Sequence, residues 1–410
     1  MRLFHATDVL VPKVDDMEKW SVIACDQFTS QPEYWERVRR YTEGEVSTIN
    51  LILPEAEKDD VETKINKINR CMQEYIAEHT FETYENSYVY IERTLVNGMV
   101  RKGVIGVVDL ETYDFREGST SLIRATEKTV EERIPPRMNI RRNAPIELSH
   151  ILLLCDDEQH VLIESLENIK SECQRIYDFD LMEGGGHLTG WLIQGKHASM
   201  FDERLRMYQD EQEKKYPIIF AVGDGNHSLA TAKACYEELK RQNSDKDLSD
   251  HPARYAMVEL ENIHDEAQQF EPIHRIVTDI DVQALLTSMK ENICAEEGYP
   301  IVCCTGNVEE TLYLSAKLGQ LPVAILQKFL DKYLAGMCEK IDYIHGEKVL
   351  RELARKTDTV GFILPNIEKG QFFMGIYKDG VLPRKTFSMG HANEKRYYLE
   401  ARKITNYTKE

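Results

Sequence analysis

Short apolar runs alternate along the chain with segments in which apolar residues recur at helical spacing. This alternation predicts a mixed α/β fold. The apolar runs predict β-strands at residues 9–13, 20–25, 88–95, 100–110, 151–155, 218–222, 254–260, 360–364 and 372–377. The helical spacing predicts α-helices at residues 31–41, 61–79, 161–176, 199–213, 228–241 and 282–291.

Capping and proline signals refine two of these helices. Ser30 is followed three residues later by Glu33, which is a capping-box pattern, and Pro32 suits a first helical turn. Asp26 is therefore placed where a strand leads into a helix, a position that often carries functional side chains. Further on, the pair of prolines at residues 135–136 is expected to end a charged helix.

The chain length favours more than one folding unit. At 410 residues, the chain is longer than one hydrophobic core usually serves. Proline and glycine are spread thinly and no linker stands out, so the boundary is poorly marked. The expected division is an N-terminal α/β region at residues 1–215 and a C-terminal α/β region at residues 216–410, with one integrated domain as the alternative.

Charge and composition narrow the classes of partner. The formal net charge is -19, so the surface is expected to repel nucleic-acid phosphates and anionic lipids. No stretch approaches the roughly 20 apolar residues of a membrane span, and the first residues lack the apolar segment of a secretory signal. The nine cysteines are scattered and form no Cys-x-x-Cys pair. We therefore expect a cytoplasmic protein with no nucleic-acid or membrane partner; its oligomeric state stays open, with a homodimer as one option.

The clearest candidate site is the segment at residues 218–233, where a buried strand leads into a helix through two glycines. Free amides at a helix start, together with the helix dipole, favour an anion. Four polar side chains crowd onto this turn: Asp224, Asn226, His227 and Ser228. The plain alternative is a tight structural turn capped by Ser228 or Asn226. His227 favours a functional turn, because a histidine gains nothing from the dipole at that end of a helix.

A second candidate lies near the C-terminus, where cations gather in an otherwise acidic chain. Arg384, Lys385, Ser388 and His391 fall within one short segment, and Lys395 with Arg396 follows. Arginine and lysine side chains make charge-assisted contacts to phosphate, so this segment is a candidate phosphate clamp. The alternative is a solvated basic tail.

Three further positions are weaker candidates. Asp26 has the chemistry of a general base or a metal ligand, or it satisfies turn amides as a structural residue. The pairs His274–Arg275 and Arg124–Glu127 are candidate substrate-binding groups, for which ordinary salt bridges are the alternative. His391 of the basic segment is a further candidate for substrate binding.

Four ordered motifs make the whole chain resemble the bacterial family known as domain of unknown function 1015. They are Trp-Ser-Val-Ile-Ala-Cys-Asp-Gln-Phe-Thr-Ser-Gln-Pro-Glu-Tyr-Trp at residues 20–35, Val-Gly-Asp-Gly-Asn-His-Ser at 222–228, Phe-Glu-Pro-Ile-His-Arg at 270–275 and Leu-Pro-Arg-Lys-Thr-Phe-Ser-Met-Gly-His at 382–391. Many members of that family carry Asp-Gly-His-His-Arg at the central motif. This chain departs from that pattern, because Ser228 stands where the arginine is usual.

The central motif is in turn similar to the phosphate-binding turn of the ParB and sulfiredoxin-like superfamily, which includes free-serine kinases. This resemblance implies a phosphate-binding core elaborated by additional α/β layers. It also implies phosphoryl transfer to free L-serine or a similar hydroxyl metabolite, from ATP, ADP or pyrophosphate, with Mg²⁺ as the expected cofactor. The ligand is then a small phosphorylated molecule.

The leading hypothesis is a small-molecule kinase with roles divided over these segments. Amides at residues 225–228, from Gly225 to Ser228, hold the donor phosphate, and His227 donates a hydrogen bond to a phosphoryl oxygen. Arg384 and Lys385 offset transition-state charge. Asp26 accepts the proton of the attacking hydroxyl, while Asp224 orients His227 or holds Mg²⁺. Two rivals use the same residues: a phosphatase or nucleotide hydrolase, and a non-catalytic sensor of a phosphorylated metabolite.

Overall fold

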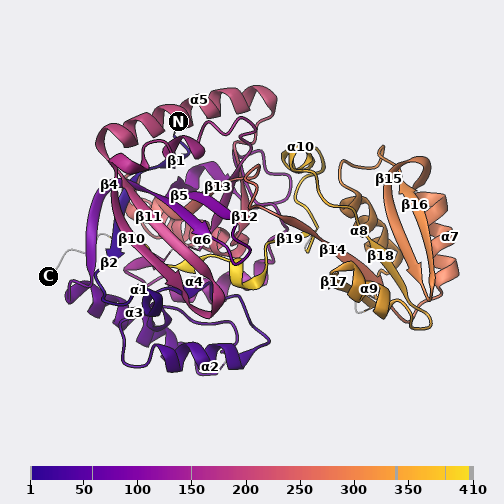
Figure 1. Ribbon diagram of the computed structural model, residues 1–410, viewed down its shortest axis with the longest axis horizontal. Helices are drawn as coiled ribbons and strands as arrows, with labels where there is room; N and C mark the ends of the chain where they lie inside the picture. The colour runs from indigo at the N-terminus through magenta and orange to yellow at the C-terminus, as the bar shows by residue number, and fades with distance from the viewer. Residues whose placement is uncertain (1, 58, 149, 338–339, 384, 406–410) are drawn as a thin grey trace. The chain divides into compact units, whose positions relative to one another are not determined.

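The computed structural model describes residues 2–57, 59–148, 150–337, 340–383 and 385–405, and these confirm the α/β class (Figure 1). The chain divides into two compact units. Unit 1 comprises Met1–Ala125, Thr129–Gln268 and His391–Glu410, and unit 2 comprises Thr126–Lys128 and Gln269–Gly390. This division does not follow the expected boundary near residue 215, because residues 216–268 and the C-terminal segment both belong with the N-terminal part of the chain.

Unit 1 is organised around one large sheet. Its strands are β1 (Phe4–His5), β2 (Thr7–Pro12), β4 (Phe81–Thr94), β5 (Val100–Asp109), β6 (Tyr113–Asp114), β7 (Ile123–Arg124), β8 (Ile146–Leu148), β9 (Leu152–Cys155), β10 (Gln174–Leu181), β11 (Gly186–Ile193), β12 (Phe220–Asp224), β13 (Tyr255–Asn262) and β21 (Ala401–Lys403). Over the described residues this sheet has 13 strands, in the order β6-β7-β12-β9-β13-β5-β4-β2-β21-β8, with β1 on β5 and β11 between β4 and β10. A separate pair joins β3 (Val22–Ile23) to β20 (Tyr397–Tyr398).

The helices of unit 1 cover both faces of this sheet. They are α1 (Met17–Trp20), α2 (Pro32–Tyr41), α3 (Val61–Ala77), α4 (Ile134–Arg141), α5 (Gly195–Lys215) and α6 (Asn226–Gln242). The helices predicted at residues 31–41, 61–79, 199–213 and 228–241 are thereby confirmed. The predicted capping box is not formed, because α2 begins after Gln31 and has no side-chain cap.

Successive side chains of the central strands point to opposite faces of the sheet, so the core of unit 1 has two layers. Even-numbered residues such as Tyr88, Tyr90, Val104 and Val258 pack with α5 and α6. Odd-numbered residues pack with α2 and α3 on the other face; they include Val89, Ile91, Ile105, Val107 and Met257. In Figure 1, α5 accordingly lies on one side of the sheet, and α2 and α3 lie on the other.

The same odd-numbered face carries a buried network of charges. Arg396 is 3% exposed; its Nε lies 2.9 Å from a carboxylate oxygen of Glu259, and its Nη2 is hydrogen-bonded to Glu400. Next to this group, Arg101 Nε lies 2.9 Å from Glu261. Arg93 donates 2.9 Å and 2.6 Å hydrogen bonds to the carbonyls of residues 394 and 395. The network therefore fixes the chain from residue 393 to residue 400 against the sheet.

Unit 2 is a smaller α/β unit. Its strands are β14 (Phe270–Val277), β15 (Cys294–Thr305), β16 (Val308–Leu314), β17 (Ile341–His345), β18 (Val360–Ile363) and β19 (Phe387–Met389), and its helices are α7 (Val282–Asn292), α8 (Pro322–Tyr333), α9 (Glu347–Leu353) and α10 (Lys369–Asp379). The strand order is β16-β15-β18-β14-β17, with β19 on β14. Residues 126–128 join this unit through a bridge between Glu127 and Leu382.

Three predicted elements are wrong. Residues 161–176 form two short 3₁₀ turns, Glu164–Leu166 and Lys170–Glu172, followed by β10, instead of one helix. The apolar run at residues 372–377 is the core of α10, because a buried helix and a buried strand share the same continuous apolar pattern. The prolines at residues 135–136 lie at the beginning of α4 instead of ending a helix. Amides in the first turn have no acceptor within the helix, so proline costs no hydrogen bond at these positions.

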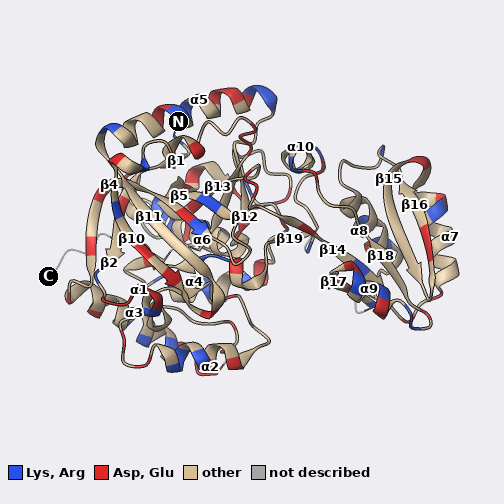
Figure 2. Ribbon diagram, viewed as in Figure 1, with Lys and Arg blue, Asp and Glu red and all other residues tan. Residues whose placement is uncertain are grey.

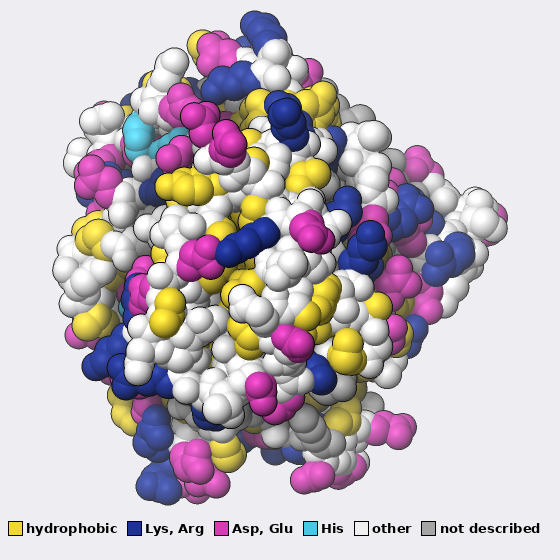
Figure 3. All heavy atoms as spheres, turned by 90° about the vertical axis from the view of Figure 1, so that its right-hand side faces the viewer, with side chains coloured by type: hydrophobic (Ala, Val, Ile, Leu, Met, Phe, Trp, Pro, Cys, Tyr) yellow, Lys and Arg dark blue, Asp and Glu magenta, His cyan; other side chains and the backbone are white. Residues whose placement is uncertain are grey.

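The acidic excess of the chain is mixed with basic residues along its helices. Acidic and basic side chains alternate along α5, and α2 carries arginines beside glutamates (Figure 2). On the face drawn in Figure 3, hydrophobic side chains are scattered between charged ones.

Among the described residues, no helix combines the length and the apolar composition needed to cross a bilayer.

Candidate functional site

Among the described residues, no side chain caps the start of α6 at the turn that follows β12. Gly225 is the N-cap residue, with φ of 80°, and it offers no side chain to the amides of the first turn. Asn226 and Ser228 lie inside the helix, so neither supplies the cap that the structural alternative required. Two of the four amides expected to hold phosphate are already engaged, because the Gly225 amide donates to Asp224 Oδ1 at 2.8 Å and the Ser228 amide donates to the Gly225 carbonyl at 3.0 Å. The positive end of the helix dipole still favours an anionic ligand at this turn.

Replacing Gly225 by alanine is expected to lower the free energy of unfolding by about 1–3 kcal/mol. A residue with a Cβ is strained at this φ, and the added Cβ would lie 3.1 Å from the Cα of Ile151. Urea unfolding of the variant measures the loss. Gly44→Ala is the matched control, because Gly44 also has a positive φ but nothing within 4 Å of a built Cβ. Equal losses in the two variants would show that the contact with Ile151 costs nothing.

Strand pairing brings His150 to this turn. The strands β9 and β12 are antiparallel, with Leu152 opposite Asp224, so the residues that precede β9 lie beside the turn that follows β12. His150 Nε2 lies 2.7 Å from the Ser228 hydroxyl oxygen. The ring of His150 also packs edge-on against Tyr398, with 5.0 Å between the ring centroids.

A second pairing brings together the two ends of unit 1. The strands β3 and β20 are antiparallel, with Ile23 opposite Tyr397, and the Ala24 amide donates to the Arg396 carbonyl at 2.9 Å. Asp26 follows β3 and Lys395 precedes β20, so both approach the same region. The Asp26 carboxylate accepts a 3.1 Å hydrogen bond from the side-chain amide of Gln27.

Lys395 neutralises the carboxylate of the turn. Its Nζ lies 3.2 Å from Asp224 Oδ2, with side-chain exposures of 13% for the lysine and 27% for the aspartate. The other carboxylate oxygen of Asp224 accepts a 2.8 Å hydrogen bond from the Gly225 amide. Burial alone would raise the pKa of Asp224, but Lys395 and this amide lower it below the ordinary value.

Five partly exposed side chains thus form one group, which we call the turn cluster: Asp26, His150, Asp224, Ser228 and Lys395. Burial lowers the pKa of His150, while the charges of Asp26 and Asp224 partly offset this effect by raising it. Both carboxylates are therefore near enough to His150 to act on its charge. The cluster combines carboxylates, an imidazole, a hydroxyl and a cation at a helix start, which is a set suited to moving a proton beside an anion.

His227 contacts the backbone of Val130, whereas the sequence hypothesis placed it beside Asp224. The Val130 amide donates a 3.2 Å hydrogen bond to His227 Nε2, which is the bond that the structure records for this ring. Burial, followed by the positive charges of Arg137 and Arg133, lowers the pKa of His227 to about 4. The ring is therefore neutral near pH 7 and accepts at Nε2, which makes Nδ1 its donor nitrogen.

Lowering the pH is expected to destabilise the protein through His227. Its folded pKa of about 4 lies below the value of 6.5 for an unperturbed ring, so the unfolded chain binds the proton first. The contribution of His227 to the free energy of unfolding is complete above pH 6.5 and is lost as the pH falls towards 4. We expect this loss to be about 1–2 kcal/mol, because solvent partly screens the ring. Urea unfolding of His227→Gln at neutral and acidic pH measures this, since glutamine keeps an acceptor but does not titrate. A pH dependence identical to that of the original protein would contradict the assignment.

The other predicted site residues of unit 1 contact backbone groups. Arg124 is 9% exposed and donates to the carbonyls of Ser121 at 3.0 Å and Pro217 at 3.4 Å. His391 is exposed and caps the short 3₁₀ helix Ala392–Glu394. In these contacts, Arg124 and His391 hold backbone segments in place. A contact of either residue with substrate stays a prediction.

The remaining predicted residues belong to unit 2 or lie outside the described residues. Arg275 is fully buried; it donates to Gln327 Oε1 at 3.0 Å and to the Lys385 carbonyl at 2.8 Å. His274 Nδ1 accepts from the Leu364 amide at 3.2 Å. Lys385 is exposed, Ser388 donates to the Gly390 carbonyl at 2.9 Å, and Glu127 lies in its bridge to Leu382. Arg384 lies outside the described residues, and a phosphate clamp from this segment stays a prediction.

Sequence reasoning missed His150 and gave Lys395 no role at the turn. His150 stands alone in an unremarkable stretch, and only the pairing of β9 with β12 places it beside Ser228. Lys395 was visible as one more cation after the basic segment. Its ion pair with Asp224 depends on β20 pairing with β3, which no local pattern reveals.

The carboxylates of the turn cluster fit a metal ion only in part. Both oxygens of Asp224 are engaged, by Lys395 and by the Gly225 amide, which makes Asp26 the better candidate ligand for Mg²⁺. Within the described ranges, a group of three closely spaced ligand atoms occurs elsewhere, at Asp156, Glu158 and His264. There His264 Nε2 is already 2.6 Å from Asp156, as a hydrogen-bonded ion pair.

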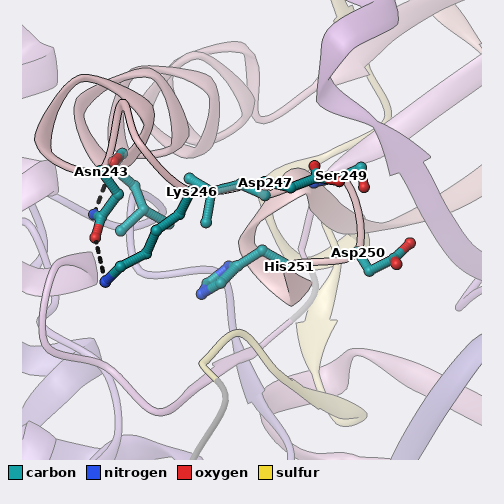
Figure 4. A pocket seen from close by; sticks show the side chains of 8 residues that line it. Asn243, Lys246, Asp247, Ser249, Asp250 and His251 are labelled. Atoms are coloured by element: carbon teal, nitrogen blue, oxygen red, sulfur yellow. Dashed lines mark hydrogen bonds between the residues drawn. The ribbon is translucent and has the colours of Figure 1, made fainter.

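A surface pocket of about 530 Å³ lies at the opposite end of α6 from the turn (Figure 4). Its lining includes Asn243, Lys246, Asp247 and His251, and Lys246 Nζ donates to the Asn243 side chain at 3.1 Å. Because α6 spans 17 residues, the pocket and the turn cluster are about 25 Å apart along the helix axis. The pocket is therefore separate from the candidate site.

Comparisons with known proteins give one family match and several solved structures of low similarity. SbnI with a C-terminal truncation, from Staphylococcus aureus, is 13% identical with a TM-score of 0.36, covering 70% of this chain and 83% of that chain. A free serine kinase variant in complex with ADP is 12% identical with a TM-score of 0.37, covering 73% and 91%. A conserved hypothetical protein from Pyrococcus furiosus is 12% identical with a TM-score of 0.35, covering 73% and 94%.

No curated protein matches the chain. The family match, in contrast, extends over nearly its whole length, from residue 9 to residue 408, and it agrees with the resemblance carried by the four sequence motifs. The chain therefore belongs to the family described as protein of unknown function (DUF1015).

Proposed function

We propose that the turn cluster of unit 1 transfers a phosphoryl group to the hydroxyl of a small metabolite, with free L-serine as the first acceptor to test. One observation carries the proposal. The Lys395 ammonium reaches the turn before α6 through its 3.2 Å ion pair with Asp224, and His150 reaches the same turn through Ser228 at 2.7 Å. The Asp26 carboxylate acts on the charge of that histidine from a third part of the sequence.

The donor phosphate is assigned to the start of α6. Backbone amides of the first turn and the helix dipole supply fixed positive charge there. Lys395 adds a side-chain cation beside them, and it takes the role that the sequence hypothesis gave to Arg384 and Lys385. Asp224 holds Lys395 in place through their 3.2 Å ion pair, and this replaces its proposed contact with His227.

The acceptor hydroxyl is assigned to the side of Asp26. A carboxylate is the acceptor for the proton that the hydroxyl releases as it attacks phosphorus. The neutral His227 ring donates a hydrogen bond from Nδ1 to a phosphoryl oxygen, because its Nε2 is occupied by the Val130 amide. Mg²⁺ bound at the donor phosphates would neutralise part of their charge, while Asp26 stays the proton acceptor, because a carboxylate that holds the ion is a weak base.

The test uses full-length protein with L-serine, Mg²⁺ and either ATP, ADP or pyrophosphate, and mass spectrometry to detect phosphoserine. We expect product with at least one donor, and we expect Asp26→Asn to lower its rate by about 10²–10⁴-fold. Glu33→Gln is the matched control, because Glu33 is an exposed carboxylate on α2. Absence of phosphoserine with every donor would refute the serine kinase.

The same mixtures separate the two rival functions. Release of phosphate without any acceptor identifies a phosphatase or nucleotide hydrolase that uses the same residues. A rise in melting temperature with a phosphorylated compound, without turnover, identifies a sensor, because a ligand that binds only the native state stabilises it.

A further inference from the structure

We infer that Ser228 is a nucleophile that carries the phosphoryl group in a covalent intermediate, with His150 as its proton acceptor. The inference rests on the proposed function and adds a step to it. The observation behind it is the 2.7 Å contact between the Ser228 hydroxyl oxygen and His150 Nε2, at the helix start that the proposed function assigns to the donor phosphate.

Both partners of this contact are held in place. Ser228 is in the first turn of α6, and its amide donates to the Gly225 carbonyl at 3.0 Å. His150 is placed by the β9–β12 pairing and packs against the ring of Tyr398. The Tyr398 hydroxyl is fixed in turn, because it accepts from the Cys25 amide at 3.3 Å and donates to Cys25 Sγ at 3.1 Å. A base that is locked against its nucleophile is the arrangement that activates a serine hydroxyl.

The charges around His150 suit a proton acceptor. Burial lowers its pKa, so the ring is neutral near pH 7 and one of its nitrogens is a free base. Once the proton arrives, Asp26 and Asp224 favour the imidazolium, since both carboxylates raise the pKa of this ring. Ser228 itself is partly exposed, so a donor can reach its hydroxyl.

Transfer through Ser228 takes two steps. In the first, Ser228 Oγ forms a bond to the donor phosphorus, the bond from phosphorus to the donor's leaving oxygen breaks, and the hydroxyl proton passes to His150 Nε2. In the second, the acceptor hydroxyl forms a bond to phosphorus and the bond to Ser228 Oγ breaks. His150 returns its proton to Ser228, and Asp26 takes the proton of the acceptor.

The first experiment looks for the intermediate in the absence of acceptor. Full-length protein is mixed with Mg²⁺ and ATP, ADP or pyrophosphate, quenched in acid, and digested for tandem mass spectrometry. We expect one acid-stable phosphoryl group on Ser228. A label that is lost in acid would place the group on a histidine or carboxylate and overturn the inference.

Variants then separate a nucleophile from a structural hydroxyl. Ser228→Ala is expected to lose the label and to form phosphoserine more than about 100-fold more slowly. His150→Gln keeps a hydrogen-bond acceptor for Ser228 but cannot take its proton, so we expect a native melting temperature with the same loss of label. The control Ser199→Ala removes an exposed hydroxyl on α5 and should label fully.

Each remaining outcome also decides the matter. If the original protein makes phosphoserine and Ser228→Ala makes it equally fast, the covalent step is refuted while the proposed function stands. If His150→Gln labels at the original rate, the assignment of His150 as proton acceptor is refuted. If no donor yields either label or product, the proposed function and the inference fail together.

Discussion

Replacing Arg396 by methionine is expected to lower the free energy of unfolding by about 3–5 kcal/mol, because a buried ion pair that loses one partner leaves uncompensated charge. Arg396 is 3% exposed and contacts two carboxylates, Glu259 and Glu400, which are 1% and 0% exposed. Burial opposes charge on Arg396, yet Glu400 and Glu259 raise its pKa above the ordinary value. Both glutamates would remain in the core without this partner. Urea unfolding near pH 7 measures the loss.

Arg351 provides the matched control for this prediction. It also contacts two glutamates, Glu309 at 2.8 Å and Glu347 at 2.7 Å, but its side chain is 39% exposed. Arg351→Met is expected to change stability by no more than about 1 kcal/mol, since water screens the pairs. The double variant Arg396→Met with Glu400→Gln should recover part of the loss, because one of the stranded charges is removed. Equal losses for Arg396→Met and Arg351→Met would show that burial of the network contributes nothing.

Replacing Lys395 by methionine is expected to slow phosphoryl transfer by about 10²–10³-fold, the effect of removing one donor from a charge-stabilising site. The change removes the cation beside the start of α6, and it leaves the Asp224 carboxylate, now unpaired with lysine, next to the incoming phosphate. Binding of pyrophosphate, measured by calorimetry, should weaken by about 10–100-fold, as expected for one charge-assisted contact.

Lys403 is the control for Lys395. It is an exposed lysine on β21, in the same C-terminal segment, so Lys403→Met makes the same change of charge and length away from the turn. We expect Lys403→Met to retain activity and pyrophosphate binding. If Lys395→Met also retains both, Lys395 is a structural partner of Asp224 and has no contact with the ligand.

Local patterns predicted those parts of this protein that depend on neighbours in sequence. The strand, glycine turn and helix around Gly225 are confirmed, because glycine is needed at the positive φ of that N-cap and the flanking runs have clear periods. Helix α10 was predicted as a strand for a physical reason. It is buried around Phe372 and Phe373, and a fully buried helix loses the polar face that distinguishes its period.

The contacts of the turn cluster depend on pairings between distant segments, and one sequence does not reveal them. His150 meets Ser228 across 78 residues, and Lys395 meets Asp224 through the β3–β20 pair. The sequence also does not reveal that Arg275 is buried, because an arginine is usually a solvent-exposed cation. In the structure its guanidinium is used within unit 2, by Gln327 and by backbone carbonyls. Registers and burial of this kind come from the fold as a whole.

The discontinuous make-up of unit 1 has a consequence for how the protein is made. The Trp20 ring donates to the Leu399 carbonyl, two residues that are 379 positions apart, and β2 pairs with β21. At about 5–20 residues per second, the ribosome delivers the second member of each pair tens of seconds after the first. Through that interval the growing chain lacks the strand that pairs with β2 at Leu10. The growing chain also lacks Lys395, so Asp224 has no lysine partner and the turn cluster is incomplete until that part of the chain has been made.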